Sequence, residues 1–223
     1  MIYSTARKLA LSFRLRLSEK TVGFVNSKYT QKRRLVFKKM DKQIYDIVTR
    51  VYRKKDYDFF IERCRITPEF YADIPRLAKQ FCKRTEFHNQ GDDPSAEFCF
   101  CYKDFTEDNF SVNYRSVLQI SKAADLFYIQ HEFDIKNIDP EGITPVLDGF
   151  DSQAYTRSQF ELDEVIGNYL VKQGLRRISQ KELDEVIPDL EMPNGVDLFG
   201  SQMTVENALF RDIYGICEAD NVK

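Results

Sequence analysis

The chain has 223 residues, of which 43% are hydrophobic and 30% are charged, a composition typical of a globular protein. Its five cysteines are odd in number, and the chain is long enough to bury a core without covalent help, which excludes a disulfide-stapled scaffold and favours reduced thiols. No apolar stretch approaches the roughly 18 residues that a membrane-spanning helix needs. We therefore expect a soluble, cytoplasmic protein.

The net charge of −2 combines two oppositely charged parts of the chain. Residues 1–40 hold 11 Lys or Arg against one acid, whereas residues 41–223 hold 22 against 34. Such asymmetry indicates that the parts differ in role. The sequence predicts a basic N-terminal extension, residues 1–39, followed by a single domain, residues 40–223.

Three interpretations of the extension remain open. It is rich in Arg and poor in acids, as a mitochondrial transit peptide is, but the apolar residues of KLALSFRLRLS recur at every second position, which fits a strand better than a transit helix. Its Lys and Arg residues could instead form an arm for nucleic acid or another anionic surface. Alternatively, the native chain starts at Met40 or the extension is disordered.

The domain is expected to begin and end with helices. Ile44, Ile47, Val48 and Val51 follow helical spacing. A second helical region is expected from Thr67, which precedes Pro68 as an N-cap would, and it extends to about residue 82. The segment HNQGDDPSA, residues 88–96, interrupts the helical pattern.

Three strands are predicted in the middle of the chain. The first is the short apolar run EFCFCYK, residues 97–103, and the polar turn DFTEDN follows it. Residues 110–120 and 127–135 then alternate strictly between apolar and polar side chains. Short connections between the runs favour an antiparallel three-stranded meander with one buried face.

Residues 137–156 contain two prolines and two glycines and are predicted to form a long ordered loop. A helix with a stripe from Leu162 to Leu170 follows, and Gly174 is placed to end it. Ser179 and Glu182 have the spacing of a capping box before a shorter helix that Pro188 is expected to end. Thr204 precedes a final helix that is expected to extend to Ile213 and Tyr214. The order of helices, strands and helices predicts the α+β fold class.

The chain has only two histidines, which limits acid–base and metal chemistry. His131 falls on the apolar face of the third predicted strand. It could be a buried base or ligand, but a core histidine bonded to a neighbour is the favoured interpretation, because no partner stands at a recognisable spacing. No catalytic residue is predicted.

Cys99 and Cys101 would project from the same strand face and could, with Cys82 and His88, surround a zinc ion. A CxC inside FCFCY lacks the turn of a zinc knuckle, however, and cysteine commonly serves as a small buried hydrophobe. Phosphate-binding loops, nucleophile elbows and other cofactor motifs are also missing from the sequence. We expect no metal and no cofactor.

Acidic residues dominate the second part of the chain. Residues 85–223 contain 27 acids and 11 bases. Such a surface repels nucleic acid and accelerates association with a basic protein. The candidate partner-binding residues are Asp104, Glu107, Asp108, Asp148, Asp151, Glu161 and Glu164.

A resemblance adds a partner class to this expectation. FELDEVIGNYLVKQGLRRISQKELDEVIPDL and the later VDLFGSQMTVENALFRD resemble the ends of bacterial immunity proteins that neutralise polymorphic toxins. The shared character is a helix, a glycine-terminated turn, a short capped helix and a final TVxNxLF-like element, over residues 157–214. The resemblance implies a small cytoplasmic binding protein with no catalytic residues to transfer.

We therefore expect a non-catalytic protein-binding domain, an immunity protein that occludes a cognate toxin through its acidic surface. Two alternatives stay open. The chain could be a nucleic-acid-associated or organellar protein that uses residues 1–39, or an enzyme that depends on His131.

Overall fold

The structure is a computed structural model that describes residues 40–89, 93–139, 141–142, 147–193 and 201–217. The expected N-terminal extension, residues 1–39, lies outside the described residues. Asp41–Lys223 is a compact unit and is described by itself. Its first helix, α2 (Lys42–Val48), begins directly after Asp41, whose carboxylate caps the helix by accepting from the backbone N–H groups of Gln43 and Ile44.

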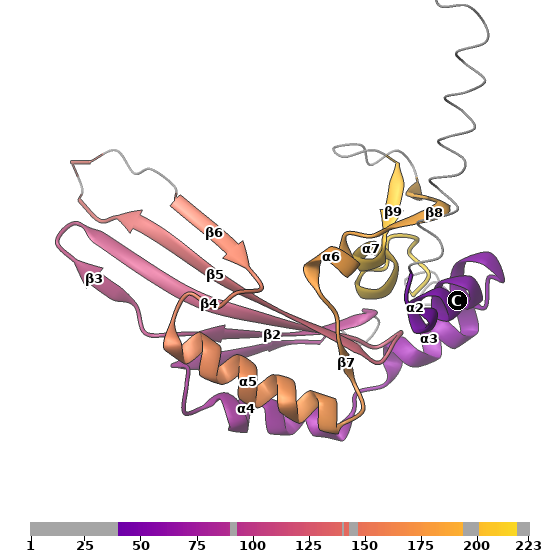
Figure 1. Cartoon of the computed structure of the whole chain (residues 1–223), viewed down its shortest axis with the longest axis horizontal. Coiled ribbons are helices and arrows are strands. Elements are labelled where there is room, and N and C mark those ends of the chain that lie inside the picture. Colours follow the sequence, from indigo (N-terminus) through magenta and orange to yellow (C-terminus); the bar gives the residue numbers. More distant parts are fainter. Residues whose placement is uncertain (1–39, 90–92, 140, 143–146, 194–200, 218–223) are drawn as a thin grey trace, which may run out of the picture. The chain divides into compact units, whose positions relative to one another are not determined.

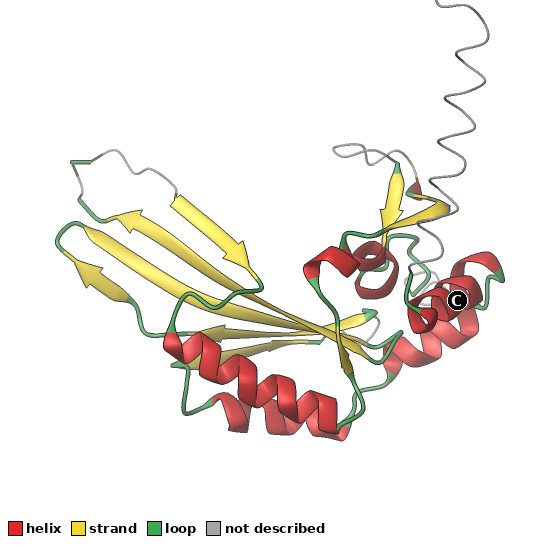
Figure 2. Cartoon of the chain, viewed as in Figure 1, coloured by secondary structure: helices red, strands yellow, loops and turns green. Residues whose placement is uncertain are grey.

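Helices and an antiparallel sheet make up the unit, so the α+β class is confirmed (Figure 2). The main sheet has seven strands in place of the predicted three. Its central path runs β1 (Arg84–His88), β2 (Ser95–Cys101), β4 (Phe110–Ser121), β5 (Leu126–Asn137) and β6 (Leu147–Asp151). The short strands β3 (Phe105–Glu107) and β7 (Arg176–Arg177) pair with β4 and β5, and β8 (Val186–Glu191) and β9 (Gln202–Thr204) form a separate pair.

The additional strands lie where the sequence pattern is weakest. β1 follows directly on the predicted helical region, β3 lies in the predicted polar turn, and β6 lies in the predicted loop. Each is five residues or shorter and pairs with a longer strand. Contacts with that neighbouring strand therefore stabilise it, and its own sequence carries little of the alternating pattern that identifies a strand. The strands predicted at 97–103, 110–120 and 127–135 correspond to β2, β4 and β5.

Two helices cover one face of the sheet's inner half, α4 (Asp73–Ala78) and α5 (Arg157–Lys172), as Figure 1 shows. The short 3-10 helix η2 (Glu69–Ala72) leads into α4. Thr67 does not cap this region. Its hydroxyl accepts from the side chain of Asn89, and Pro68 occupies the cap position without a side-chain bond.

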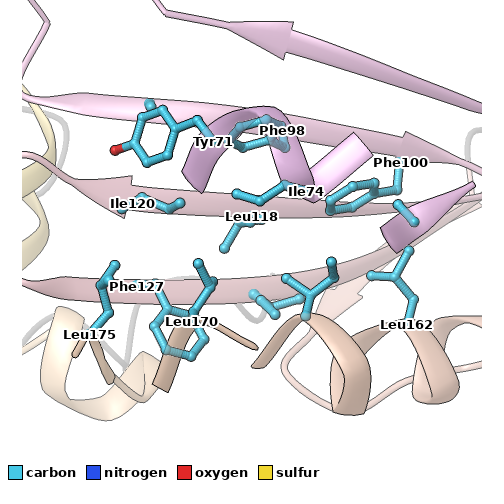
Figure 3. Packing of buried hydrophobic residues seen from close by; sticks show 14 of the residues in the cluster. Tyr71, Ile74, Phe98, Phe100, Leu118, Ile120, Phe127, Leu162, Leu170 and Leu175 are labelled. Atoms are coloured by element: carbon cyan, nitrogen blue, oxygen red, sulfur yellow. The ribbon is translucent and has the colours of Figure 1, made fainter. Parts of the chain in front are cut away.

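The core between helices and sheet is apolar and rich in aromatic side chains (Figure 3). Leu118 and Ile120 of β4 face Phe127 and Ile129 of β5, as the alternation predicts, and all are essentially inaccessible. From α5, the buried side chains are those of Leu162, Ile166 and Leu170. Burial of this kind contributes roughly 1.5–3 kcal/mol per large side chain, and it fixes the register of the sheet.

Local signals set the ends of the C-terminal helices, and those at Gly174 and Ser179 were predicted. Thr156 and Gln159 form a capping box at the start of α5. At its end Gly174 takes a φ of +89°, a left-handed conformation that glycine adopts without strain. The N–H groups of Gly174 and Leu175 donate to the carbonyls of Val171 and Leu170, which is the Schellman motif. Ser179 with Glu182 caps α6 (Gln180–Leu183).

A second group of helices packs at the inner end of the sheet. It contains α2, the π-helical turn η1 (Thr49–Arg53), α3 (Tyr57–Arg65) and α7 (Val205–Phe210). The hydroxyl of Tyr52 donates to the carbonyl of Ala208 at 2.7 Å, and that of Ser121, at the end of β4, donates to the carbonyl of Leu209 at 2.6 Å. Among the described residues, no helix has the length and hydropathy to cross a bilayer.

Candidate functional site

The face of the sheet opposite α4 and α5 is polar, and its side chains form rows across the strands. Antiparallel register places Cys101 beside Arg115, Arg115 beside Glu132, and Glu132 beside Phe150. A second row joins Glu86, Cys99 and Val117. We call this surface the open face. It places carboxylates, guanidinium groups and thiols side by side.

Two grooves lie on the open face and share Arg115, Glu132 and Phe150. The inner groove, of about 560 Å³, extends from the sheet to Gln180 and Leu183 at α6 and to Arg211 just after α7. The outer groove, of about 520 Å³, follows β4, β5 and β6 outward. Together their linings contain seven carboxylates and four Lys or Arg side chains, so the field in the grooves opposes the binding of a polyanion.

Beyond the ends of α4 and α5 the sheet continues as an uncovered extension, which we call the wing: residues 104–114, 133–137 and 147–151 (Figure 1). On the face that the helices cover further in, Phe105, Val112, Ile135 and Leu147 form one row across β3, β4, β5 and β6. Phe105 and Leu147 at its two ends are each more than half exposed. Phe150, on the open face of the wing, is 68% exposed.

Five of the seven acids predicted to bind a partner belong to this wing, and all five are exposed. Asp104 and Asp148 line the outer groove. Glu107 ends β3, and Asp108 occupies the following turn with a φ of +48°. Asp151 ends β6, where the pKa of its carboxyl is lowered by hydrogen bonds from the backbone of Gln153 and the side chain of Ser152. Acids and exposed apolar side chains therefore lie close together along β3 and β6.

The other two predicted acids lie on α5. Glu161 accepts from Arg157 one helical turn earlier, at 2.6 Å, and Glu164 is exposed. The structure therefore divides the seven predicted acids between the wing and the helix layer.

His131 belongs to a buried polar network at the boundary between the covered half of the sheet and the wing. Its Nδ1 lies 2.8 Å from the hydroxyl of Ser116, which shares a second hydrogen bond with the hydroxyl of Tyr102. Its Nε2 lies 3.7 Å from a carboxylate oxygen of Asp163 on α5, and Arg177 donates to the same oxygen. Burial acts to raise the pKa of Asp163, but His131 and Arg177 outweigh it and hold that pKa below its usual value.

Ser116, His131 and Asp163 are the three residue types of a hydrolytic triad, but they are not arranged as a catalytic triad is. Ser116 and His131 are fully buried, and the hydroxyl is shared with Tyr102 instead of pointing into a groove. A nucleophile must reach its substrate, and this hydroxyl does not. Its geometry supports a structural role, in which the hydroxyls of Tyr102 and Ser116 and the Nδ1 of His131 are hydrogen-bonded to one another beneath α5.

The five cysteines all lie in described residues and are free thiols. Cys64 and Cys217 are buried. Cys99 and Cys101 face the open side of β2, whose other side carries the fully buried Ala96, Phe98 and Phe100. Burial, followed by the neighbouring Cys101 thiol, raises the pKa of Cys99 to about 12.

Sequence reasoning missed three groups of functional interest. Glu86 was missed because no strand was predicted between the helical region, which was expected to end at about residue 82, and the segment 88–96, although Phe87 stands between polar neighbours in RTEFH. Phe150 was assigned to a loop. Asp163 was not singled out, because only the packing of α5 on β5 brings it to His131.

No protein-family model, curated protein or solved structure matches this chain. The function therefore has to be argued from the site itself.

Proposed function

We propose that this protein is a non-catalytic binding domain that docks another protein on the wing, and that it acts as an immunity protein by occluding the active surface of a cognate toxin. The observation that carries the proposal is the composition of the wing, which exposes apolar side chains on both faces, Phe105 and Leu147 on one and Phe150 on the other, among the acids Asp104, Glu107 and Asp148. Aromatic side chains that can be desolvated dominate the energy of protein interfaces, and surrounding charges steer the encounter.

The chemistry of the partner follows from the charge of the surface. An acidic rim accelerates association with a basic protein and repels nucleic acid. A toxin domain that itself acts on nucleic acid would present such a basic surface. The resemblance of residues 157–214 to immunity proteins supports a toxin as that partner.

The test is an affinity purification from the native host with the tagged full chain, at low and at moderate salt, with mass spectrometry of the bound proteins. We expect a basic protein whose recovery falls as salt rises. Expressed alone in a sensitive bacterium, the recovered basic protein should arrest growth. Co-expression of the full chain should restore growth.

Two variants connect the result to the wing. The double substitution Phe105→Ser and Phe150→Ser should abolish recovery and growth rescue, whereas Val171→Ser, which removes a comparably exposed apolar side chain from α5, should leave both unchanged. Recovery of nucleic acid or organellar proteins that depends on residues 1–39, with no effect of the wing variant, would contradict the proposal and favour the alternative role of the basic extension.

A further inference from the structure

A cluster of metal-ligating side chains lies on the open face where β1 pairs with β2. Cys99 and Cys101 are two residues apart on β2 and therefore project to the same side. Glu86 is directly opposite Cys99 in the antiparallel register. The two sulfur atoms and a carboxylate oxygen of Glu86 all lie within 4.8 Å of one another.

These positions fit a small thiophilic cation after modest side-chain rotation. Zinc binds sulfur at about 2.3 Å and oxygen at about 2.0–2.2 Å in tetrahedral geometry, which separates neighbouring ligand atoms by roughly 3.4–3.8 Å. Atoms within 4.8 Å therefore need to approach by about 1 Å, and the three side chains are only half-buried. His88 lies two residues beyond Glu86 on the same face, with its Nε2 3.9 Å from a Glu86 oxygen, and it lines the inner groove. Its imidazole could supply the fourth ligand of the tetrahedral site. If it does not, a water molecule from the groove could be the fourth ligand.

The charges around the cluster are compatible with a bound cation. Two thiolates and a carboxylate around a divalent cation leave one excess negative charge, the same as the empty cluster carries, and the neighbouring guanidinium group of Arg84 can offset it. Arg84 lies 2.7 Å from a Glu86 oxygen, and its Nη2 lies 3.8 Å from the sulfur of Cys101. Because the Arg84 side chain is 67% exposed, it can turn away when the cation takes its place beside Glu86.

Packing alone does not explain the position of these two cysteines. Cys64 and Cys217 occur in the core, where a thiol behaves as a small hydrophobe. Cys99 and Cys101 instead project from the polar side of β2 into grooves lined by carboxylate, guanidinium and amide groups. Thiols in such a setting are available to a ligand.

We propose that Cys99, Cys101 and Glu86 form a binding site for a divalent thiophilic cation, and Zn²⁺ is the ion to test first. The site binds the cation through two thiolates and a carboxylate, and the two thiol protons pass to solvent. It does not depend on the proposed partner, since it lies at the β1–β2 edge of the open face and uses none of the exposed apolar side chains of the wing.

The first experiment titrates the reduced, metal-free full chain with Zn²⁺ alone by calorimetry, and with Cd²⁺ alone by the thiolate-to-metal charge-transfer absorption. We expect one equivalent of each ion and a charge-transfer band that requires both cysteines. A titration with no saturable binding, or binding without the band, would overturn the proposal.

Substitutions identify which residues bind the cation. Outer-shell changes commonly cost 10–100-fold in metal affinity, so the ligand substitutions Cys99→Ser and Cys101→Ser should each weaken Zn²⁺ binding by more than about 100-fold, and Glu86→Gln by at least about tenfold. Two controls should bind as the wild type does: Cys82→Ser, whose thiol packs against the core, and Glu97→Gln, an acid on the same face of β2. Equal loss in a control and a ligand variant would place the ion elsewhere.

If a variant does not fold, the site can still be tested on the wild-type protein by measuring how fast its cysteines are alkylated. Zn²⁺ should slow alkylation of Cys99 and Cys101, read by mass spectrometry of the peptides, and leave the rate at Cys82 unaltered. Equal alkylation of Cys99 and Cys101 with and without Zn²⁺ would contradict the site.

Discussion

The inner and outer halves of β4 and β5 share one alternation pattern but have different surroundings. In the inner half, Leu118 and Ile129 are covered by α4 and α5 and are inaccessible to water. In the outer half, Val112 and Ile135 continue the same face, but the row that they form ends in exposed side chains. Strand alternation thus determines which residues share a face, whereas the reach of the helices determines whether that face is core or surface.

The Ser116–His131 pair marks the boundary between these halves. On the face that α4 and α5 cover, the cross-strand pairs inward from it, Leu118–Ile129 and Ile120–Phe127, are apolar and buried, and those outward from it are half-buried or exposed. At the same level the side chain of Gln159, at the start of α5, donates to the backbone carbonyls of Arg115 and Glu132. Polar groups replace apolar ones where the helix cover begins.

The largest predicted effect is on the free energy of unfolding, and it distinguishes two phenylalanine substitutions, one in each half. Phe127→Ala removes a fully buried ring and should lower the free energy of unfolding by about 3–5 kcal/mol. Phe110→Ala removes a ring that is 49% exposed and should cost less than about 1 kcal/mol. Urea denaturation measures both. Equal losses would show that the wing belongs to the stabilising core and is not a free surface.

The second prediction concerns the boundary network. The pKa of Asp163 is lowered in the folded state, so its contribution to stability is complete above the unfolded value near 3.8 and is lost as pH falls through the lower folded value. Asp163→Asn should cost about 1.5–3 kcal/mol at neutral pH, the usual contribution of hydrogen bonds to a charged group. The difference from wild type should shrink in acid.

Asp125→Asn is the matched control for Asp163→Asn, because Asp125 pairs with Arg63 but is 64% exposed. Exposed ion pairs contribute about 0–1 kcal/mol, so this variant should change little at any pH. A loss in Asp163→Asn that stays constant down to strong acid would contradict the role given to its charge.

The third prediction tests packing within the wing. A methyl group at Gly149 would lie 2.6 Å from the ring of Phe133, which the register places beside it. Gly149→Ala should therefore force the ring to move and cost about 1 kcal/mol, at the low end of overpacking effects because the wing is uncovered and can relax. Thermal unfolding measures the loss. A loss as large as that of Phe127→Ala would mean that Phe133 is held as rigidly as the inner core.

The smallest predicted effect on stability belongs to the proposed docking surface. Phe105→Ser with Phe150→Ser should change the free energy of unfolding by no more than about 0.5 kcal/mol per site, as surface substitutions usually do. Urea denaturation of this variant beside Val171→Ser gives the comparison. A severe loss in the wing variant alone would indicate that the two rings stabilise the fold, and it would remove them as evidence for a docking surface.

Much of the fold could be predicted because local signals agree with the packing. The alternation of β4 and β5, the stripe of α5, the glycine after it, the capping box at Ser179 and the helix start at Thr204 all have the predicted roles. The short strands β1, β3 and β6 could not be predicted, because their stability comes from the neighbouring strand. Pro188, expected to end a helix, lies within β8, and Ile213 and Tyr214 lie beyond the end of α7.

The candidate site could be predicted only in part. Composition identified the acids, but it could not divide them between the wing and α5, since that division depends on the path of the chain through residues 137–156. The exposed aromatic side chains were invisible because a phenylalanine in a strand is ordinarily expected in the core. The metal-ligating cluster needed the register that places Glu86 beside Cys99.

The most direct test of the wing as the docking surface is amide hydrogen exchange on the purified complex of the full chain with the partner recovered from the host. We expect protection on binding at residues 105–112 and 147–151, with exchange in α5 around Glu161 and Glu164 unchanged. Protection confined to α5 or to residues 1–39, with the wing exchanging as in the free protein, would contradict the account.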